Sequence, residues 1–337
     1  PLEGLQTTLI SPSVTTLYSG MLPGVISGHY QTAEAEIDLA RLCRFAGARL
    51  FVESASGIDT SMRTVICGDR PDVHYDVLSI DVGITPDLAV PGAAEHVIPV
   101  KPISSFQSRF DTFLAGVRAG RPVAGVGVVG AGAGGVELVL ALNHRLQLEG
   151  VNVRCHLFAE GEAVLPGHSE AVRGRFAATL ENVGIEVHTN FRVSRVGADE
   201  VEREDGLAVA VDAVFWVTSA APQRWLAETG LSVSDAGFLQ VRDTLQTVSH
   251  AEVFAAGDTA VMVNHPRPRA GVFAVRQGRP LADNLLRLLQ GRLPKAFAPQ
   301  QRFLALISTG PKYAVASRGS AAWSGRWVWH WKDWIDR

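Results

Sequence analysis

Cysteine is scarce in this sequence. Its 337 residues include three cysteines, Cys43, Cys67 and Cys155, which form neither a C-x-x-C nor a C-x-x-x-x-C pair and no metal-ligand cluster. A disulfide framework is excluded, and isolated cysteines are typical of a reducing, cytoplasmic setting. Cys155 falls inside a predicted strand, where a buried thiol behaves as a small hydrophobic side chain.

The sequence also lacks an excess of positive charge and a long apolar run. It has 31 Lys and Arg against 34 Asp and Glu, a formal net charge of −3, and no stretch dense in basic residues. A nucleic-acid partner is therefore not expected. The longest uncharged apolar stretch near the middle, residues 122–136, is rich in glycine and shorter than the roughly 20 residues that a membrane-spanning helix needs.

The composition is that of a globular α/β protein. Hydrophobic residues make up 47% of the chain and charged residues 19%, and at about 150 residues per domain the length suggests two domains. Residues 123–129, 136–148 and 152–158 form the pattern strand, helix, strand, one complete βαβ unit. Similar patterns predict strands at 7–10, 49–52, 238–241 and 253–255 and near Val187, Ala208 and Val214, with helices at 33–45 and 272–289.

A glycine motif joins the first strand of this βαβ unit to its helix. Gly130, Gly132 and Gly135 have the spacing G-x-G-x-x-G. In this context the first glycine permits a tight turn, the second lets a pyrophosphate approach the backbone, and the third allows helix and strand to pack closely. The free N–H groups of the helix N-terminus favour an anion there. The motif therefore predicts a bound dinucleotide.

The second strand of the unit ends in Ala159 and Glu160. An acid at this strand end normally accepts hydrogen bonds from the adenosine ribose. In the usual register that place falls on Ala159, so either Glu160 reaches the ribose from the next position or it is a solvated loop residue. No Arg follows closely to hold a 2′-phosphate, which favours NAD over NADP.

A second signature carries a family resemblance. The segment from Thr247 ends in Gly257-Asp258, and Tyr75-Asp-Val-Leu-Ser-Ile-Asp81-Val-Gly83 precedes it. Together with the glycine motif, these segments resemble the two-dinucleotide flavin reductases of the pyridine nucleotide-disulfide oxidoreductase superfamily over nearly the whole chain. The sequence is also similar to the type II NADH dehydrogenase-related branch that accompanies, or is fused to, selenide, water dikinase. Five segments carry this closer likeness: 18–24, 37–39, 270–277, 306–310 and 331–337.

The resemblance implies two Rossmann-like, three-layer domains, of which the FAD domain is discontinuous and the NAD domain is inserted into it. The expected bounds are 1–110 and 237–297 for the FAD domain, 111–236 for the NAD(P) domain and 298–337 for a Trp-rich C-terminal segment containing β-structure. Members of the superfamily begin with a strand and a glycine loop for the FAD pyrophosphate, which this sequence lacks. We therefore expect a fragment of a longer protein that by itself binds FAD weakly.

The implied cofactors are FAD and NAD(P)H, with NADH favoured. No catalytic side chain and no metal ligand are expected, because the flavin carries the chemistry. Glu137 either lies near the nicotinamide or is an acid that favours the helix dipole. The residues expected on the flavin side are Pro12, Gly20, Met21, Leu22, Asp81, Gly83, Gly257, Asp258 and Gln277. Those expected on the nicotinamide side are Gly130, Gly132, Gly135, Glu137 and Glu160.

The isolated cysteines imply that electrons pass from flavin directly to an external acceptor, a quinone or another two-electron acceptor. Relatives carry two Gln on a helix beside the flavin; Gln277 matches one, whereas Gly271 or Phe273 replaces the other. A link to selenium metabolism follows from the closer likeness. The alternatives are a partner of selenide, water dikinase without turnover, and a sulfide:quinone reductase-like enzyme.

The C-terminal segment is dense in tryptophan. It allows two interpretations: an interfacial surface that holds the protein at the inner face of a membrane, or packing over the flavin domain. The strict alternation from Trp327 to Trp331 favours a strand in the second case. The tryptophans concerned are Trp323, Trp327, Trp329, Trp331 and Trp334.

Overall fold

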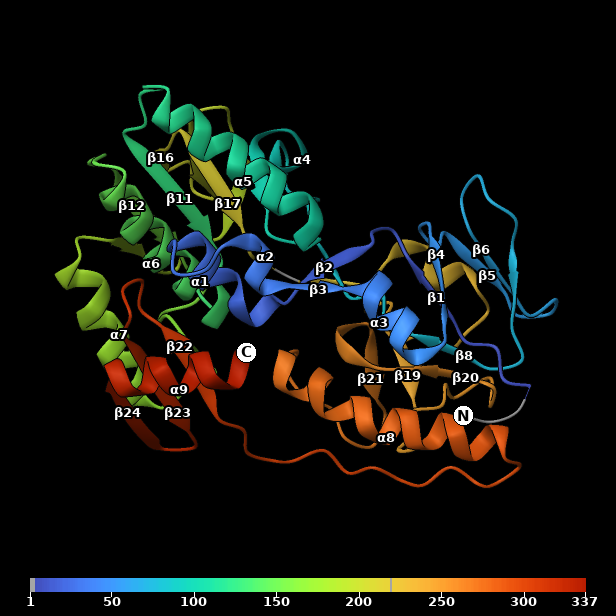
Figure 1. Cartoon of the computed structure of the whole chain (residues 1–337). Helices are drawn as coiled ribbons and strands as arrows, with labels where there is room; N and C mark the ends of the chain where they lie inside the picture. The colour runs from blue at the N-terminus through green and yellow to red at the C-terminus, as the bar shows by residue number, and fades with distance from the viewer. Residues whose placement is uncertain (1–3, 219) are drawn as a thin grey trace. The chain divides into compact units, whose positions relative to one another are not determined.

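The computed structural model describes residues 4–218 and 220–337, which form two compact units (Figure 1). Of the described residues, unit 1 comprises 4–16, 36–85 and 221–301, and unit 2 comprises 17–35, 86–218, 220 and 302–337. Both units mix helices with parallel strands, which confirms the predicted α/β class. Among the described residues, no helix combines the length and the apolar character needed to cross a membrane.

Unit 2 is built on a five-stranded parallel sheet in the order β10-β17-β11-β12-β13. Every residue of the central strand β11 is buried, because helices cover one face of the sheet and a small antiparallel sheet covers the other. The strands are β10 (Val97–Pro99), β11 (Gly125–Val129), β12 (Arg154–Phe158), β13 (Glu186–His188) and β17 (Ala213–Trp216). The predicted βαβ unit is therefore confirmed.

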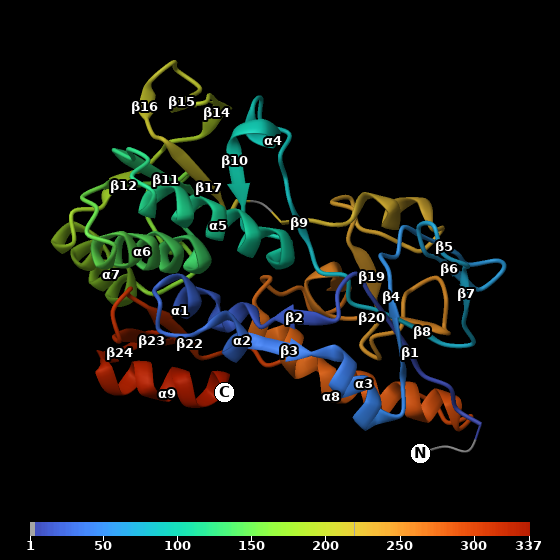
Figure 2. The same ribbon diagram turned by 45° about the horizontal axis from the view of Figure 1, so that its top comes forward.

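The helices α5 (Ile103–Arg118), α6 (Ala133–Leu148) and α7 (Glu170–Asn182) contribute the largest hydrophobic core of unit 2. The second face of the sheet packs against the antiparallel strands β14 (Val193–Val196), β15 (Glu200–Arg203) and β16 (Ala208–Ala210), which Figure 2 shows side by side. Phe158, Phe191 and Trp216 fill this second core.

The C-terminal part of unit 2 forms the antiparallel sheet of β22 (Ala305–Ser308), β23 (Ala314–Arg318) and β24 (Ala321–Gly325), followed by α9 (Arg326–Asp336). The predicted strand over 327–331 is thus wrong. Trp327 and Trp331 stack at a centroid distance of 6.3 Å, which residues four apart do on a helix, while Val328 and Trp329 are buried. The alternation misled because a run of five residues is too short to separate the two periods: on the helix, Trp327 and Trp331 share one face and Trp329 lies on another.

The N-terminal segment of unit 2, residues 17–35, packs on this C-terminal part, residues 302–337. It contains η1 (Ser19–Met21), α1 (Leu22–Ile26) and α2 (Thr32–Ala35). Met21 and Val25 share a core cluster with Val328 and Trp329 of α9. The first and last segments of unit 2 therefore stabilise one another.

Unit 1 contains parallel strand pairs rather than one continuous sheet. The pairs are β1 (Thr8–Ser11) with β4 (Arg49–Val52), β8 (Leu78–Ile80) with β20 (Val253–Ala255), and β19 (Leu239–Val241) with β21 (Ala260–Met262). The long helix α8 (Gly271–Leu289) packs Leu281 and Leu285 against the core of these strands.

The helix predicted at 33–45 is interrupted by β3 (Glu36–Asp38), so that α3 runs only over Leu39–Ala46. The cause is local: the Asp38 carboxylate accepts a hydrogen bond from the Arg41 backbone N–H at 2.8 Å and caps a new helix. The remaining elements are β2 (Thr15–Leu17), β5 (Gly57–Asp59), β6 (Thr64–Ile66), β7 (Val73–His74), β9 (Thr85–Pro86), α4 (Ala93–His96), β18 (Ala220–Ala221), η2 (Arg224–Glu228) and η3 (Gly257–Thr259).

The contact between β11 and α6 yields a stability prediction. A Cβ on Gly135 would lie 2.8 Å from the Gly130 carbonyl carbon and overlap its oxygen, whereas a Cβ on the neighbouring Gly134 would meet only a Val217 methyl at 3.6 Å. Gly135→Ala should therefore destabilise the protein by about 1–3 kcal/mol or more, as overpacking does. Gly134→Ala should be neutral or stabilise by up to about 1 kcal/mol, since it only replaces a helical glycine. Urea denaturation midpoints measure both changes, and equal effects of the two substitutions would refute the argument.

Candidate functional site

The glycine turn of unit 2 is the first part of the site. Gly130 follows β11 with φ +113°, and a Cβ there would lie 3.0 Å from the Val217 carbonyl carbon. Gly135 is equally constrained by its contact with Gly130. Both glycines are therefore required by the packing of the protein itself.

Gly132 is different, because nothing in the folded protein requires a glycine there. Its φ of −71° and ψ of −176° suit any residue, and, apart from its neighbours in the chain, no described residue has an atom within 4 Å of the position of a Cβ. Gly132 is the N-cap of α6, whose first turn is capped by no side chain. The open space therefore lies beside unoccupied N–H groups at the positive end of a helix, where a phosphate group fits.

Glu137 lies one turn into α6 and has partners that the sequence did not reveal. Its Oε1 atom accepts hydrogen bonds from the Ser308 backbone N–H at 2.7 Å and from the Ser308 hydroxyl at 2.9 Å. Burial raises the pKa of the Glu137 carboxyl, while Lys332 and the two Ser308 hydrogen bonds act in the opposite direction. Glu137 therefore joins α6 to β22 and is more than an acid at a helix N-terminus.

Lys332 of α9 completes this polar cluster. Its ammonium group donates to the Gly20 carbonyl at 2.7 Å and forms an ion pair with Asp336 one turn later. Burial raises the pKa of the Asp336 carboxyl above its usual value, and the neighbouring Lys332 opposes this shift. The backbone of the predicted turn at Gly20 is thereby fixed, whereas the side chains of Met21 and Leu22 are buried in the core of unit 2.

Glu160 is exposed at the end of β12, and an arginine lies beside it. Arg192 Nε is 3.3 Å from Glu160 Oε1 and 3.5 Å from Glu204 Oε1. Arg192 is 32 residues from Glu160 in the sequence and approaches it because the paired strands β12 and β13 end side by side. Ion pairs this exposed stabilise a fold by only about 0–1 kcal/mol, so the two carboxylates and the guanidinium stay available to a ligand.

Unit 1 holds the second part of the site, at the turn after β20. Gly257 has φ +69°, and a Cβ there would collide with the Asp81 carboxylate. The Gly257 N–H donates to the Gln277 side chain at 2.7 Å, and the Asp258 carbonyl accepts from Arg269 at 3.3 Å. The signature residues Asp81, Gly257 and Asp258 are thus brought together, and buried Gln277 holds their turn from α8.

A small cavity of about 40 Å³ adjoins this turn, with Gly257, Asp258 and Gln277 in its lining. The other predicted flavin-side residues of unit 1 are exposed Pro12, which follows β1, and Gly83, which follows β8 with φ +67°. Gly20, Met21, Leu22 and all the predicted nicotinamide-side residues belong to unit 2.

The three cysteines are free and buried. Burial raises the pKa of the Cys155 thiol to about 12 and that of Cys67 above its usual value. A thiol is nucleophilic only as thiolate, so the raised pKa opposes the reactivity of Cys67 and Cys155 at neutral pH.

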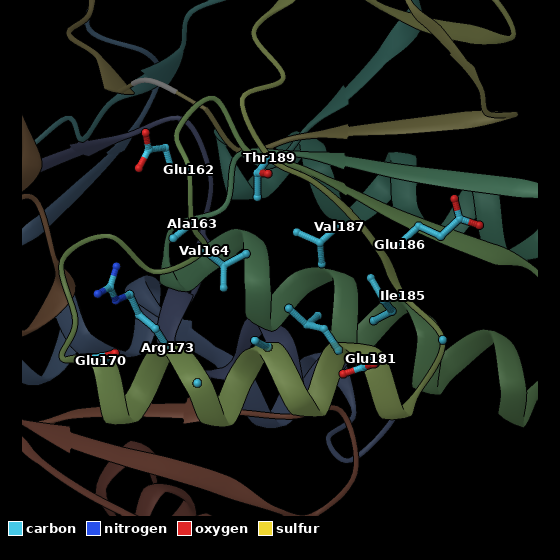
Figure 3. A pocket seen from close by; sticks show the side chains of 14 residues that line it. Glu162, Ala163, Val164, Glu170, Arg173, Glu181, Ile185, Glu186, Val187 and Thr189 are labelled. Carbon is cyan, nitrogen blue, oxygen red and sulfur yellow. The ribbon is translucent and has the colours of Figure 1, made fainter.

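A larger cavity of about 700 Å³ lies in unit 2 between α7 and the segment around β13 (Figure 3). The labelled side chains of Val164, Ile185 and Val187 give it an apolar wall, and Arg173 and Glu186 lie at its borders. Among the described residues, those that line it do not include the glycine turn, so this cavity is distinct from the dinucleotide site.

Known proteins resemble this chain in sequence. The chain is 28% identical over 257 residues to an NADH dehydrogenase-like protein of Mycobacterium tuberculosis, which covers 70% of this chain and 61% of that protein. It is 24% identical over 188 residues to the type II NADH:quinone oxidoreductase of Haemophilus influenzae, covering 51% of this chain and 42% of that enzyme. The chain therefore spans about half the length of these curated relatives.

Solved structures share the fold. The sulfide:quinone oxidoreductase of Aquifex aeolicus matches with a TM-score of 0.82 at 18% identity, covering 98% of this chain and 84% of that one. NDH2 from Plasmodium falciparum matches with a TM-score of 0.82 at 14% identity, covering 98% and 92%. The family model described as pyridine nucleotide-disulphide oxidoreductase matches residues 3–278, and the chain belongs to that family.

Proposed function

We propose that this chain belongs to an FAD-dependent oxidoreductase that takes a hydride from NADH and passes two electrons to a quinone or another two-electron acceptor without a redox disulfide. The observation that carries the proposal is Gly132, a glycine at a helix N-terminus that no contact within the protein requires. Family membership and the relatives named above support the same chemistry.

The residues described above fit the two cofactors. FAD, when bound, supplies the step from a hydride donor to an external acceptor. In the turn of Asp81, Gly257 and Asp258, a carboxylate accepts a hydrogen bond from a ribityl hydroxyl of FAD. The Gln277 side chain holds the backbone of this turn by accepting from the Gly257 N–H. Gly132 and the first turn of α6 receive the pyrophosphate of NADH, and Glu160 accepts hydrogen bonds from the ribose.

Direct transfer to an external acceptor is supported by the state of the thiols. Cys43, Cys67 and Cys155 are buried and free, and the raised thiol pKa of Cys155 and Cys67 opposes a thiolate intermediate. The sulfide:quinone reductase-like alternative needs reactive cysteines and is therefore disfavoured. Quinone is the acceptor that the names of the type II relatives suggest.

Two narrower parts of the proposal concern partners. The first is an association with selenide, water dikinase. Its support is the five segments that resemble the branch associated with that enzyme, three of which meet around Gly20, Ser308 and Lys332.

The second is peripheral contact with a membrane through α9, where Trp327 and Trp334 are exposed beside buried Val328 and Trp329. A partner without turnover is the alternative, and steady-state oxidation of NADH with added FAD and a soluble quinone separates it from the enzyme.

Gly132→Asp tests the dinucleotide site. Aspartate is a good N-cap, so folding stability should be kept, but its carboxylate would occupy the open space and repel a pyrophosphate. The KM for NADH should rise by about tenfold or more, the equivalent of about 1.4 kcal/mol. Gly174→Asp, at another open glycine position on α7, is the matched control and should leave KM unchanged. An unchanged KM in the Gly132 variant would remove the main support of the proposal.

Replacing all three cysteines by alanine tests the route of the electrons. If no thiol takes part, the triple variant should keep most of its turnover with NADH, apart from losses that follow a measured fall in melting temperature. Loss of turnover with FAD still bound and the melting temperature unchanged would instead favour the sulfide-reductase alternative.

Glu160 and Arg192 decide the choice of nucleotide. Glu160→Ala should raise the KM for NADH several-fold, because each lost ribose hydrogen bond is worth about 0.5–1.5 kcal/mol. Arg192→Ala should change the KM for NADH little, since NADH carries no 2′-phosphate for the guanidinium to bind. The KM values of both variants for NADH and NADPH measure this, and a wild-type preference for NADPH that Arg192→Ala abolishes would reverse the assignment.

A further inference from the structure

Two neighbouring strands of unit 2 place metal-ligating side chains on one face of the sheet. In the parallel pairing of β12 and β13, His156 lies opposite Glu186, and Phe158 lies opposite His188. Residues two apart on a strand share a face, so both histidines and the glutamate project to the same side. The sequence pattern did not reveal this cluster, because only the pairing of the strands brings these residues together.

The distances among these three side chains match a coordination sphere. His156 Nδ1 is 3.1 Å from His188 Nε2 and 3.4 Å from Glu186 Oε2, and the ligand atoms of all three residues lie within 4.8 Å of one another. Bonds of about 2.0–2.1 Å in a tetrahedral zinc site separate the ligand atoms by about 3.3 Å. The two separations from His156 Nδ1 already agree with this value. The exposed Glu186 side chain can move to adjust the third separation, between Glu186 and His188.

The burial of His156 supports a role in this cluster. The residue is 3% exposed, and its Nε2 atom has no hydrogen-bond partner among the described residues. The polar partners of this buried ring are thus Glu186 and His188.

The surroundings give the cluster one closed and one open side. The His188 ring stacks on Phe158 at 4.9 Å, and Phe191 packs on Phe158 at 4.8 Å, which fixes the imidazole and excludes water there. The Glu186 side chain points away from Ile185 and Val187, which face the cavity of about 700 Å³ (Figure 3). It is 52% exposed, so an ion can enter the cluster directly from solvent on that side. The positive charge that opposes a cation is Arg154, which is exposed on the same strand.

We propose that His156, Glu186 and His188 form a site for a divalent cation of the zinc class, with water as the fourth ligand. Two imidazoles and one carboxylate are a ligand set that zinc accepts, whereas magnesium and calcium prefer oxygen ligands alone. The ion would brace the end of the sheet next to the dinucleotide acid, since the His188 carbonyl accepts a hydrogen bond from the Ala159 N–H at 2.8 Å. This site is independent of the proposed electron transfer.

The test is zinc binding by chain that has first been stripped with a chelator. Titration of Zn²⁺ in competition with a chromophoric chelator should show one tight site per chain, and Zn²⁺ should raise the melting temperature. His188→Gln and Glu186→Gln should each weaken the affinity by about tenfold or more, the loss that follows even from removal of a ligand's outer partner. Bound Co²⁺ should show the visible bands of a tetrahedral site, and the two variants should lose them.

His74→Gln, at an exposed histidine of unit 1, is the matched control and should bind zinc as the wild type does. Because Glu186 is exposed, its variant keeps the test decisive if the His188 variant fails to fold. Absence of a tight site, or equal affinity in the Glu186, His188 and His74 variants, would overturn the proposal and leave a hydrogen-bonded imidazole pair.

Discussion

The contact between the backbone of Gly130 and α6 at Gly135 governs much of unit 2. It sets how closely the helix approaches β11, because no side chain fits between the two. This approach aims the first turn of the helix at the open space over Gly132. It also fixes where Glu137, half a turn further on, projects towards Ser308. One backbone contact thus determines the place for a ligand and the position of the nearest buried acid.

A second constraint ties the two ends of the chain to this helix. Glu137 binds β22 through Ser308, and Lys332 on α9 holds the carbonyl of Gly20 near the N-terminus. Burying these charges costs free energy unless they are paired and hydrogen-bonded, and here they are. The C-terminal helix therefore belongs to the same compact unit as the glycine turn.

The sequence alone predicted those elements whose structure depends on interactions between residues close together in the chain. The βαβ unit was predictable because burial on both faces gives β11 an uninterrupted apolar run and the glycine spacing has a steric cause. The helix at α9 was not, since Trp327, Trp329 and Trp331 alternate as in a strand, whereas Trp327, Trp331 and Trp334 have the spacing of a helix, and the sequence alone does not choose between the two patterns. Contacts across the chain were equally hidden: Ser308 is 171 residues from Glu137, and neither Arg192 nor the cluster of His156 and His188 has any signature in the sequence.

The central claim of the proposed function is that NADH bound by this protein reduces FAD bound by the same protein. The visible absorption of FAD bound to this protein, followed under anaerobic conditions after NADH is added, tests it most directly. Excess FAD compensates for weak binding, and equilibrium dialysis establishes that both nucleotides are bound. The account predicts that the flavin band bleaches much faster than that of free FAD with the same NADH. Bleaching no faster than in free solution, with both nucleotides bound, would contradict it.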